Sequence, residues 1–177
     1  MRSEGVEIER KFLVRGALWR AGIERSEQME QGYLAQSEAS GVAFPGCQVR
    51  VRRSGDSGEL TIKSREAGPS RREFEFAIDA DNATALLAAF CAVRIVKTRH
   101  HLTFAREHWI VDEFAGENAG LTVAEIELDS VDQSIELPAW AGLEVTHVPR
   151  FYNAALVTCP FATWLDRDYW LEILKAC

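Results

Sequence analysis

The sequence predicts a mainly β, α+β fold: a closed eight-stranded antiparallel barrel with flanking helices and a helical C-terminal segment. Charged and apolar residues alternate with a period of two along most of the first two thirds of the chain. One stretch of helical spacing interrupts these strands, and helical spacing returns in the last third. A chain of 177 residues, 47% of them hydrophobic, is long enough for the single domain that we expect over residues 1–177.

The first expected strand, residues 6–14, places Glu7, Glu9 and Lys11 on one face. A run of Ser, Gly and Asp at residues 54–58 is typical of a hairpin turn and separates two further strands. The remaining strands follow from the same alternation. They are expected at residues 47–53, 59–64, 71–78, 94–104, 109–114 and 121–129.

The helices are predicted from apolar residues at helical spacing. Residues 81–93 carry Leu86, Leu87 and Phe90, and Asp81 or Asn82 can cap this helix. Two more helices are expected at residues 150–157 and 160–175, the second with Pro160 in its first turn.

The composition excludes several classes of protein. A net charge of −7 and a pI near 5.2 argue against binding of nucleic acid, which requires an excess of Lys and Arg. Neither a signal peptide nor a membrane-length apolar run is present in the sequence, so we expect no membrane partner. Four widely spaced cysteines without a C-x-x-C pair favour a reducing cytoplasm. A homodimer is left open.

The charges of each strand are nearly pure in sign. An alternating charged face is usually the solvated side of an antiparallel sheet, but such faces normally mix signs and neutral polar residues. If these faces instead line a barrel, each buried charge needs an opposite charge, a metal or a ligand. A metal-bound polyanion between carboxylates and cations meets that requirement.

The residues E-I-E-R-K at positions 7–11 form the pattern E-x-E-x-K, which resembles the signature of the CYTH superfamily, the triphosphate tunnel metalloenzymes. Further motifs follow in that family's order: VRVR at 49–52, LTIK at 60–63, REFE at 72–75, KTR at 97–99, VDEF at 111–114 and EIE at 125–127. The RFYN segment at 150–153 is similar to short, single-domain bacterial members, often named inorganic triphosphatases. The resemblance implies an eight-stranded tunnel through which a triphosphate threads.

The resemblance also implies a role for the acidic residues, with Mg²⁺ or Mn²⁺ as the metal. The main metal would be held by Glu7, Glu9 and Glu127. A second metal, or an oriented water, would be served by Glu73, Glu75, Asp112 and Glu125.

The basic residues would grip the phosphates. By the same resemblance this set is Lys11, Arg50, Arg52, Lys63, Lys97 and Arg99. Lys63 is also a candidate for activating the attacking water, because neighbouring cations favour a neutral amine. The expected catalytic residues are therefore Lys63, Glu125 and Glu127.

The function expected from these features is metal-dependent hydrolysis of a triphosphate, foremost inorganic tripolyphosphate, with nucleoside or thiamine triphosphate as other substrates. An adenylate cyclase that makes cyclic AMP from ATP is the first alternative, because it needs the same metal and triphosphate clamp. A non-catalytic polyphosphate or nucleotide sensor is the alternative from another class. Such a sensor would keep the cations and lose the carboxylates, which this sequence retains.

Overall fold

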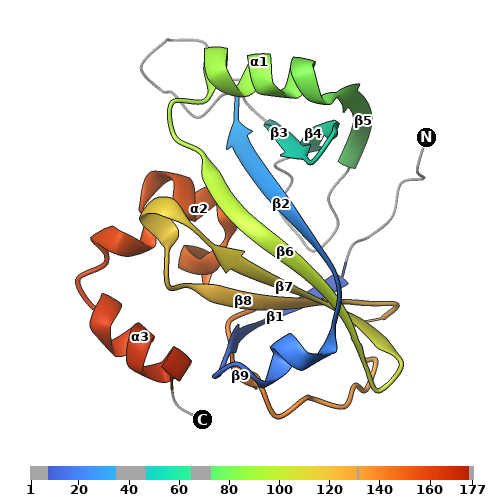
Figure 1. Ribbon diagram of the computed structural model, residues 1–177, viewed down its shortest axis with the longest axis vertical. Helices are drawn as coiled ribbons and strands as arrows, with labels where there is room; N and C mark the ends of the chain where they lie inside the picture. The colour runs from blue at the N-terminus through green and yellow to red at the C-terminus, as the bar shows by residue number, and fades with distance from the viewer. Residues whose placement is uncertain (1–7, 35–46, 65–72, 131, 176–177) are drawn as a thin grey trace. The chain divides into compact units, whose positions relative to one another are not determined.

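The computed structural model describes residues 8–34, 47–64, 73–130 and 132–175, and its ribbon is shown in Figure 1. Contacts divide the described residues into two compact units. The smaller unit comprises residues 29–34, 47–64 and 73–94, and the larger unit comprises residues 8–28, 95–130 and 132–175. Within the described residues, none of the helices combines the length and apolar character that spanning a bilayer requires.

All strand pairings are antiparallel, and the chain is mainly β, as the sequence predicts. The strands are β1 (Ile8–Val14), β2 (Ile23–Tyr33), β3 (Cys47–Ser54), β4 (Ser57–Ser64), β5 (Glu73–Asp79), β6 (Ile95–Phe104), β7 (Glu107–Phe114), β8 (Thr122–Leu128) and β9 (Ala141–Glu144). The helices are α1 (Ala80–Phe90), α2 (Asn153–Thr158) and α3 (Arg167–Lys175), with short 3-10 turns at Leu18–Gly22, Gly116–Asn118, Pro149–Phe151 and Phe161–Thr163.

The hydrogen-bonded order is β5-β4-β3-β2 in the smaller unit and β2-β6-β7-β8-β1-β9 in the larger unit, with β2 contributing to both. The described residues thus form nine strands rather than eight. No pairing among them joins β5 to β9, so the expected closure of the barrel is not seen. Seven of the nine strands correspond to ranges expected from the alternation. The sequence does not locate β2 and β9, because IERSEQMEQGY is polar on both sides and β9 has only four residues.

In the smaller unit, α1 packs across β3, β4 and β5 (Figure 1). Leu87 and Ala83 of α1 are fully buried against Val51 of β3. The cap differs from the expectation: Asp79, rather than Asp81 or Asn82, accepts a hydrogen bond of 2.7 Å from the backbone N–H of Asn82. The helix therefore begins directly at the end of β5, without a loop.

The helix approaches β2 so closely that only glycine fits at position 32. A Cβ there would lie 2.6 Å from both Cβ and Sγ of Cys91. We expect Gly32→Ala to destabilise the protein by about 1–3 kcal/mol, because the core must shift to admit the methyl group. Thermal unfolding measures this loss. Gly22→Ala is the matched control, since its nearest neighbour would be 3.9 Å away; equal melting temperatures of the two variants would contradict the argument.

The larger unit has an apolar cluster on each side of its sheet. One contains Phe12, Trp109 and Trp140, which pack edge to face or tilted. The other joins Leu13 and Val123 of the sheet to the C-terminal segment, where Phe151 and Phe161 are buried. The two C-terminal helices are thus confirmed, although Pro160 precedes a 3-10 turn rather than starting an α-helix.

Candidate functional site

Strand register gathers the predicted charges of the larger unit on one face of its sheet. Lys11 of β1 lies opposite Glu125 of β8, and Arg99 of β6 lies opposite Asp112 of β7. Asp112 in turn lies opposite Val123, two residues from Glu125 on the same side of β8. We call this surface the larger polar face. Its members are Glu9, Lys11, Lys97, Arg99, Asp112, Glu125 and Glu127.

Asp112 holds two cations at the buried end of the larger polar face. Arg99 donates to both carboxylate oxygens, Nε to Oδ1 at 2.8 Å and Nη2 to Oδ2 at 2.8 Å, and Lys97 Nζ also donates to Oδ2. Lys97 and Asp112 are each 1% exposed. Burial opposes ionisation of Asp112, but the charges and hydrogen bonds of Lys97 and Arg99 prevail and hold its pKa well below the usual range. Both carboxylate oxygens thus serve to fix cations.

Glu125 links this pair to β1. Lys11 Nζ donates to Glu125 Oε1 at 2.7 Å and lies 2.8 Å from Glu9 Oε1, while Arg99 Nη2 lies 3.5 Å from Glu125 Oε2. Burial opposes the ionisation of Glu125, but the charges of Lys11, Lys97 and Arg99 together outweigh it and lower the pKa of this carboxyl. Glu9 and Glu125, on neighbouring strands, therefore share the ammonium of Lys11. A metal ion can bridge two carboxylates that lie this close.

Glu9 and Glu127 are direct cross-strand partners, so two carboxylates lie opposite each other at the more exposed part of the face. Like charges in this position are destabilising unless a cation lies between them. The donor set of hard oxygens on β1 and β8 therefore fits Mg²⁺ or Mn²⁺. Glu7 lies outside the described residues. Within the described ranges, no three His, Cys, Asp or Glu groups are already arranged as a metal cage.

The smaller unit carries a second charged face, which we call the smaller polar face. Arg50 and Arg52 of β3 lie opposite Thr61 and Glu59 of β4, and Thr61 lies opposite Glu75 of β5. This face also includes Lys63, whose Nζ lies 3.0 Å from Glu73 Oε2. The register thus brings together the predicted cations and carboxylates of β3, β4 and β5.

Two observations show that the smaller polar face is short of cations for its carboxylates and of acceptors for its donors. Burial, with repulsion from Glu59 and Glu73, raises the pKa of Glu75. Arg50 Nε is buried and has no hydrogen-bond partner among the described residues. A metal ion near Glu75 would offset the repulsion that this carboxylate experiences from Glu59 and Glu73.

Sequence reasoning did not include three residues that lie beside the predicted ones, Glu59, His101 and Glu27. Glu59 lies on the same side of β4 as Thr61 and Lys63, so the alternation of the sequence could have identified it. His101 continues the row of Lys97 and Arg99 along β6, and its Nε2 lies 2.8 Å from Glu27 on β2. No sequence signal could have found Glu27, because β2 was not predicted as a strand.

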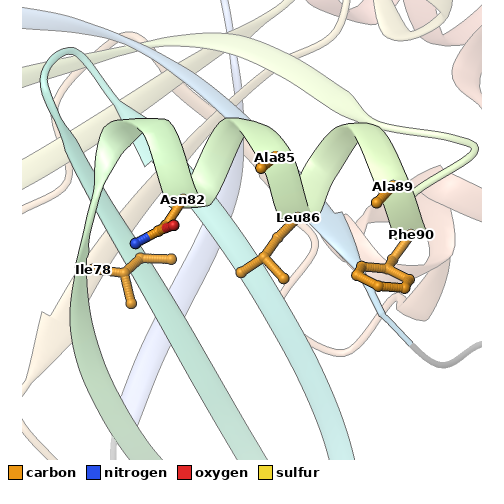
Figure 2. A pocket seen from close by; sticks show the side chains of 6 residues that line it. All are labelled: Ile78, Asn82, Ala85, Leu86, Ala89 and Phe90. Carbon is orange, nitrogen blue, oxygen red and sulfur yellow. The ribbon is translucent and has the colours of Figure 1, made fainter.

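The smaller unit also contains an apolar groove of about 370 Å³, shown in Figure 2. It is lined by residues of α1, among them Leu86 and Phe90, and by Ile78 of β5. Ile78 has the opposite parity from Glu73 and Glu75, so the groove lies on the helix-covered side of β5. Its apolar lining does not suit a triphosphate.

Residues 5–152 match the family model of the CYTH domain. The chain belongs to the CYTH domain family. This CYTH domain is 37% identical over 163 residues to a protein of Acetivibrio thermocellus named inorganic triphosphatase, across 92% of this chain and 99% of the relative. The family model and this relative both span the two compact units.

Solved structures agree with the family assignment. The crystal structure of the inorganic triphosphatase NE1496 matches this CYTH domain with a TM-score of 0.63 and 32% identity, over 89% of this chain and 95% of that one. The Hippeastrum protein HpAC1, described as an adenylyl cyclase candidate with a dominant triphosphatase activity, matches with a TM-score of 0.55 and 15% identity, over 70% and 80% of the chains. At that identity the likeness shows the fold alone.

Proposed function

We propose that this CYTH domain hydrolyses inorganic tripolyphosphate with Mg²⁺ or Mn²⁺. The observation that carries the proposal is the combination of a relative named inorganic triphosphatase at 37% identity and two polar faces built from opposite charges. On the larger polar face, carboxylates hold the cations in place before substrate binds. Cations positioned in this way can stabilise the charge that a phosphoryl group carries during its transfer.

The larger polar face supplies metal ligands and cations in this proposal. Glu9, Glu125 and Glu127, together with Glu7 outside the described residues, would hold a metal. The metal, when bound, neutralises phosphate charge and lowers the pKa of a coordinated water. Lys97 and Arg99 bind phosphate oxygens and keep their positions through Asp112. We therefore assign Asp112 to positioning these cations, in preference to the metal role that the family resemblance implies.

The smaller polar face has a set of candidate phosphate ligands of its own. Arg50 and Arg52 bind one phosphate through their guanidinium groups. Glu73 and Glu75 serve a second metal or orient water. Lys63, in contact with Glu73, either binds phosphate or accepts the proton of the attacking water.

The function is tested by phosphate release from tripolyphosphate, ATP and thiamine triphosphate, each with Mg²⁺, Mn²⁺ or a chelator. We expect release from tripolyphosphate with metal, and its loss when the chelator removes the metal, because no metal then neutralises the phosphate charge or activates the attacking water. Restoration by added metal is the control for chelator damage. Undiminished release in the chelator would contradict the metal-dependent reaction.

Product analysis separates the other functions. Cyclic AMP from ATP, identified by chromatography, would assign the cyclase reaction. Tight binding of tripolyphosphate with no product under any metal would assign a sensor.

A further inference from the structure

One carboxylate oxygen of the smaller polar face accepts three hydrogen bonds. Arg50 Nη2 donates to Glu59 Oε1 at 3.0 Å, Arg52 Nη2 donates at 2.6 Å, and the Thr61 hydroxyl donates at 3.1 Å. Arg50 Nη2 also donates to Thr61 Oγ1 at 2.8 Å. Two guanidinium groups and a hydroxyl around one anionic oxygen are the environment in which a phosphate oxygen is bound.

The strands fix this arrangement. Glu59 and Arg52 are direct cross-strand partners, and Arg50 and Thr61 are the next pair along the same face. The side chains of Arg50, Arg52 and Glu59 are between 15% and 24% exposed, so solvent screens them only in part. Burial opposes ionisation of Glu59, but the two arginines outweigh it and lower the pKa of this carboxyl. Glu59 is therefore a persistent anion within the arginine pair.

Arg50 Nη2 and Arg52 Nη2 donate to Glu59, so these N–H groups are not available to a phosphate at the same time. A phosphate that takes the position of Glu59 Oε1 must first displace it. The free energy of these contacts is then subtracted from the affinity for substrate and product alike. When phosphate leaves, the carboxylate returns and the arginines are not left unpaired, which favours release.

We propose that Glu59 is a built-in competitor of phosphate at the Arg50–Arg52 pair, and that it weakens binding of both triphosphate substrate and phosphate products at this position. The proposal rests on the proposed function, because it deepens the role of the same cations. It makes Glu59 a residue that sets the affinity of the Arg50–Arg52 pair for phosphate, rather than a ligand of metal or substrate.

The test is Glu59→Gln, which keeps the shape of the side chain and removes its charge. We expect the Kd for tripolyphosphate, measured by calorimetry in chelator, to fall about tenfold. The reason is that the charged hydrogen bonds from Arg50 and Arg52 to Glu59 no longer compete with those to phosphate. KM for tripolyphosphate and the inhibition constants of pyrophosphate and orthophosphate should fall in parallel. Glu59→Asp, shorter by one methylene, should lie between the wild type and Glu59→Gln, and it replaces that variant if the latter fails to fold.

The matched control is Glu30→Gln, which removes the same charge from the same unit. Glu30 pairs with Arg94 at 2.8 Å and has the opposite parity from Gln31, so it lies away from the smaller polar face. It should leave every constant unchanged. Unchanged or weaker tripolyphosphate binding in Glu59→Gln, with an active wild type, would overturn the role of Glu59 alone. A wild type that neither binds nor hydrolyses tripolyphosphate would overturn the proposed function and this inference with it.

Discussion

Glu125→Gln should lower kcat for metal-dependent hydrolysis of tripolyphosphate by at least about a hundredfold, the scale expected when a preorganised charge is removed from a reacting centre. Glu125 is the carboxylate that joins Lys11 at 2.7 Å to Arg99 at 3.5 Å, and it lies among the proposed metal ligands. The amide keeps the size of the side chain but loses the charge that holds both the metal and the two cations. Steady-state phosphate release over a range of metal concentrations measures the effect.

The control for this substitution is Glu113→Gln. Glu113 lies on β7 next to Asp112, on the opposite face, and pairs with Arg20 at a partly exposed position. Exposed ion pairs contribute little, so this variant should retain wild-type turnover and melting temperature. Wild-type kcat in a folded Glu125→Gln protein would remove Glu125 from the catalytic residues. Recovery of activity at high metal concentration would instead limit its role to metal affinity.

The larger polar face was predictable from the sequence because β-strands convert a period of two into a single surface. Lys11, Arg99 and Asp112 were each assigned to it from alternation and from the motifs that resemble the CYTH superfamily, and the register places them there. What the alternation could not give is the pairing between them. Asp112 accepts hydrogen bonds from Lys97 and Arg99, and these contacts depend on which strands are neighbours and on how far each side chain extends.

The strand β2 shows the limit of the same reasoning. Its residues from Ile23 to Met29 have no apolar face of their own, so hydrophobic periodicity gives no signal. Its place in the sheet is set by pairing with β3 in the smaller unit and with β6 in the larger one. Glu27 and Gly32 therefore acquire their importance only from tertiary neighbours, His101 in one case and Cys91 in the other.

Asp112→Asn should be the most destabilising single substitution of a charged residue on the larger polar face. It leaves Lys97 fully buried and Arg99 largely buried without the carboxylate that both donate to. Removing one partner of a buried ion pair costs about 3–5 kcal/mol, because the remaining charge is neither hydrated nor neutralised. For a chain of this length that loss lowers the melting temperature by about 6–20 °C. Urea and thermal unfolding measure it.

The pH dependence of this loss has a defined sign. The folded protein holds the pKa of Asp112 below that of the unfolded chain, so the carboxylate contributes stability above about pH 4 and loses it as the pH falls further. The gap between wild type and Asp112→Asn should therefore be full at neutral pH and shrink in acid. Asp129→Asn, at an exposed position after β8, is the control and should match the wild type throughout.

A second substitution separates the ion pair from general damage to the core. Lys97→Met removes one of the two cations while retaining an unbranched apolar side chain of similar length. Added to Asp112→Asn, it should recover part of the lost stability, since one fewer buried charge is left without its counterion. Additive losses in the double variant would mean that Lys97 and Asp112 stabilise the fold independently. If stability recovers but tripolyphosphate hydrolysis does not, the Lys97–Asp112 pair serves phosphate binding rather than folding.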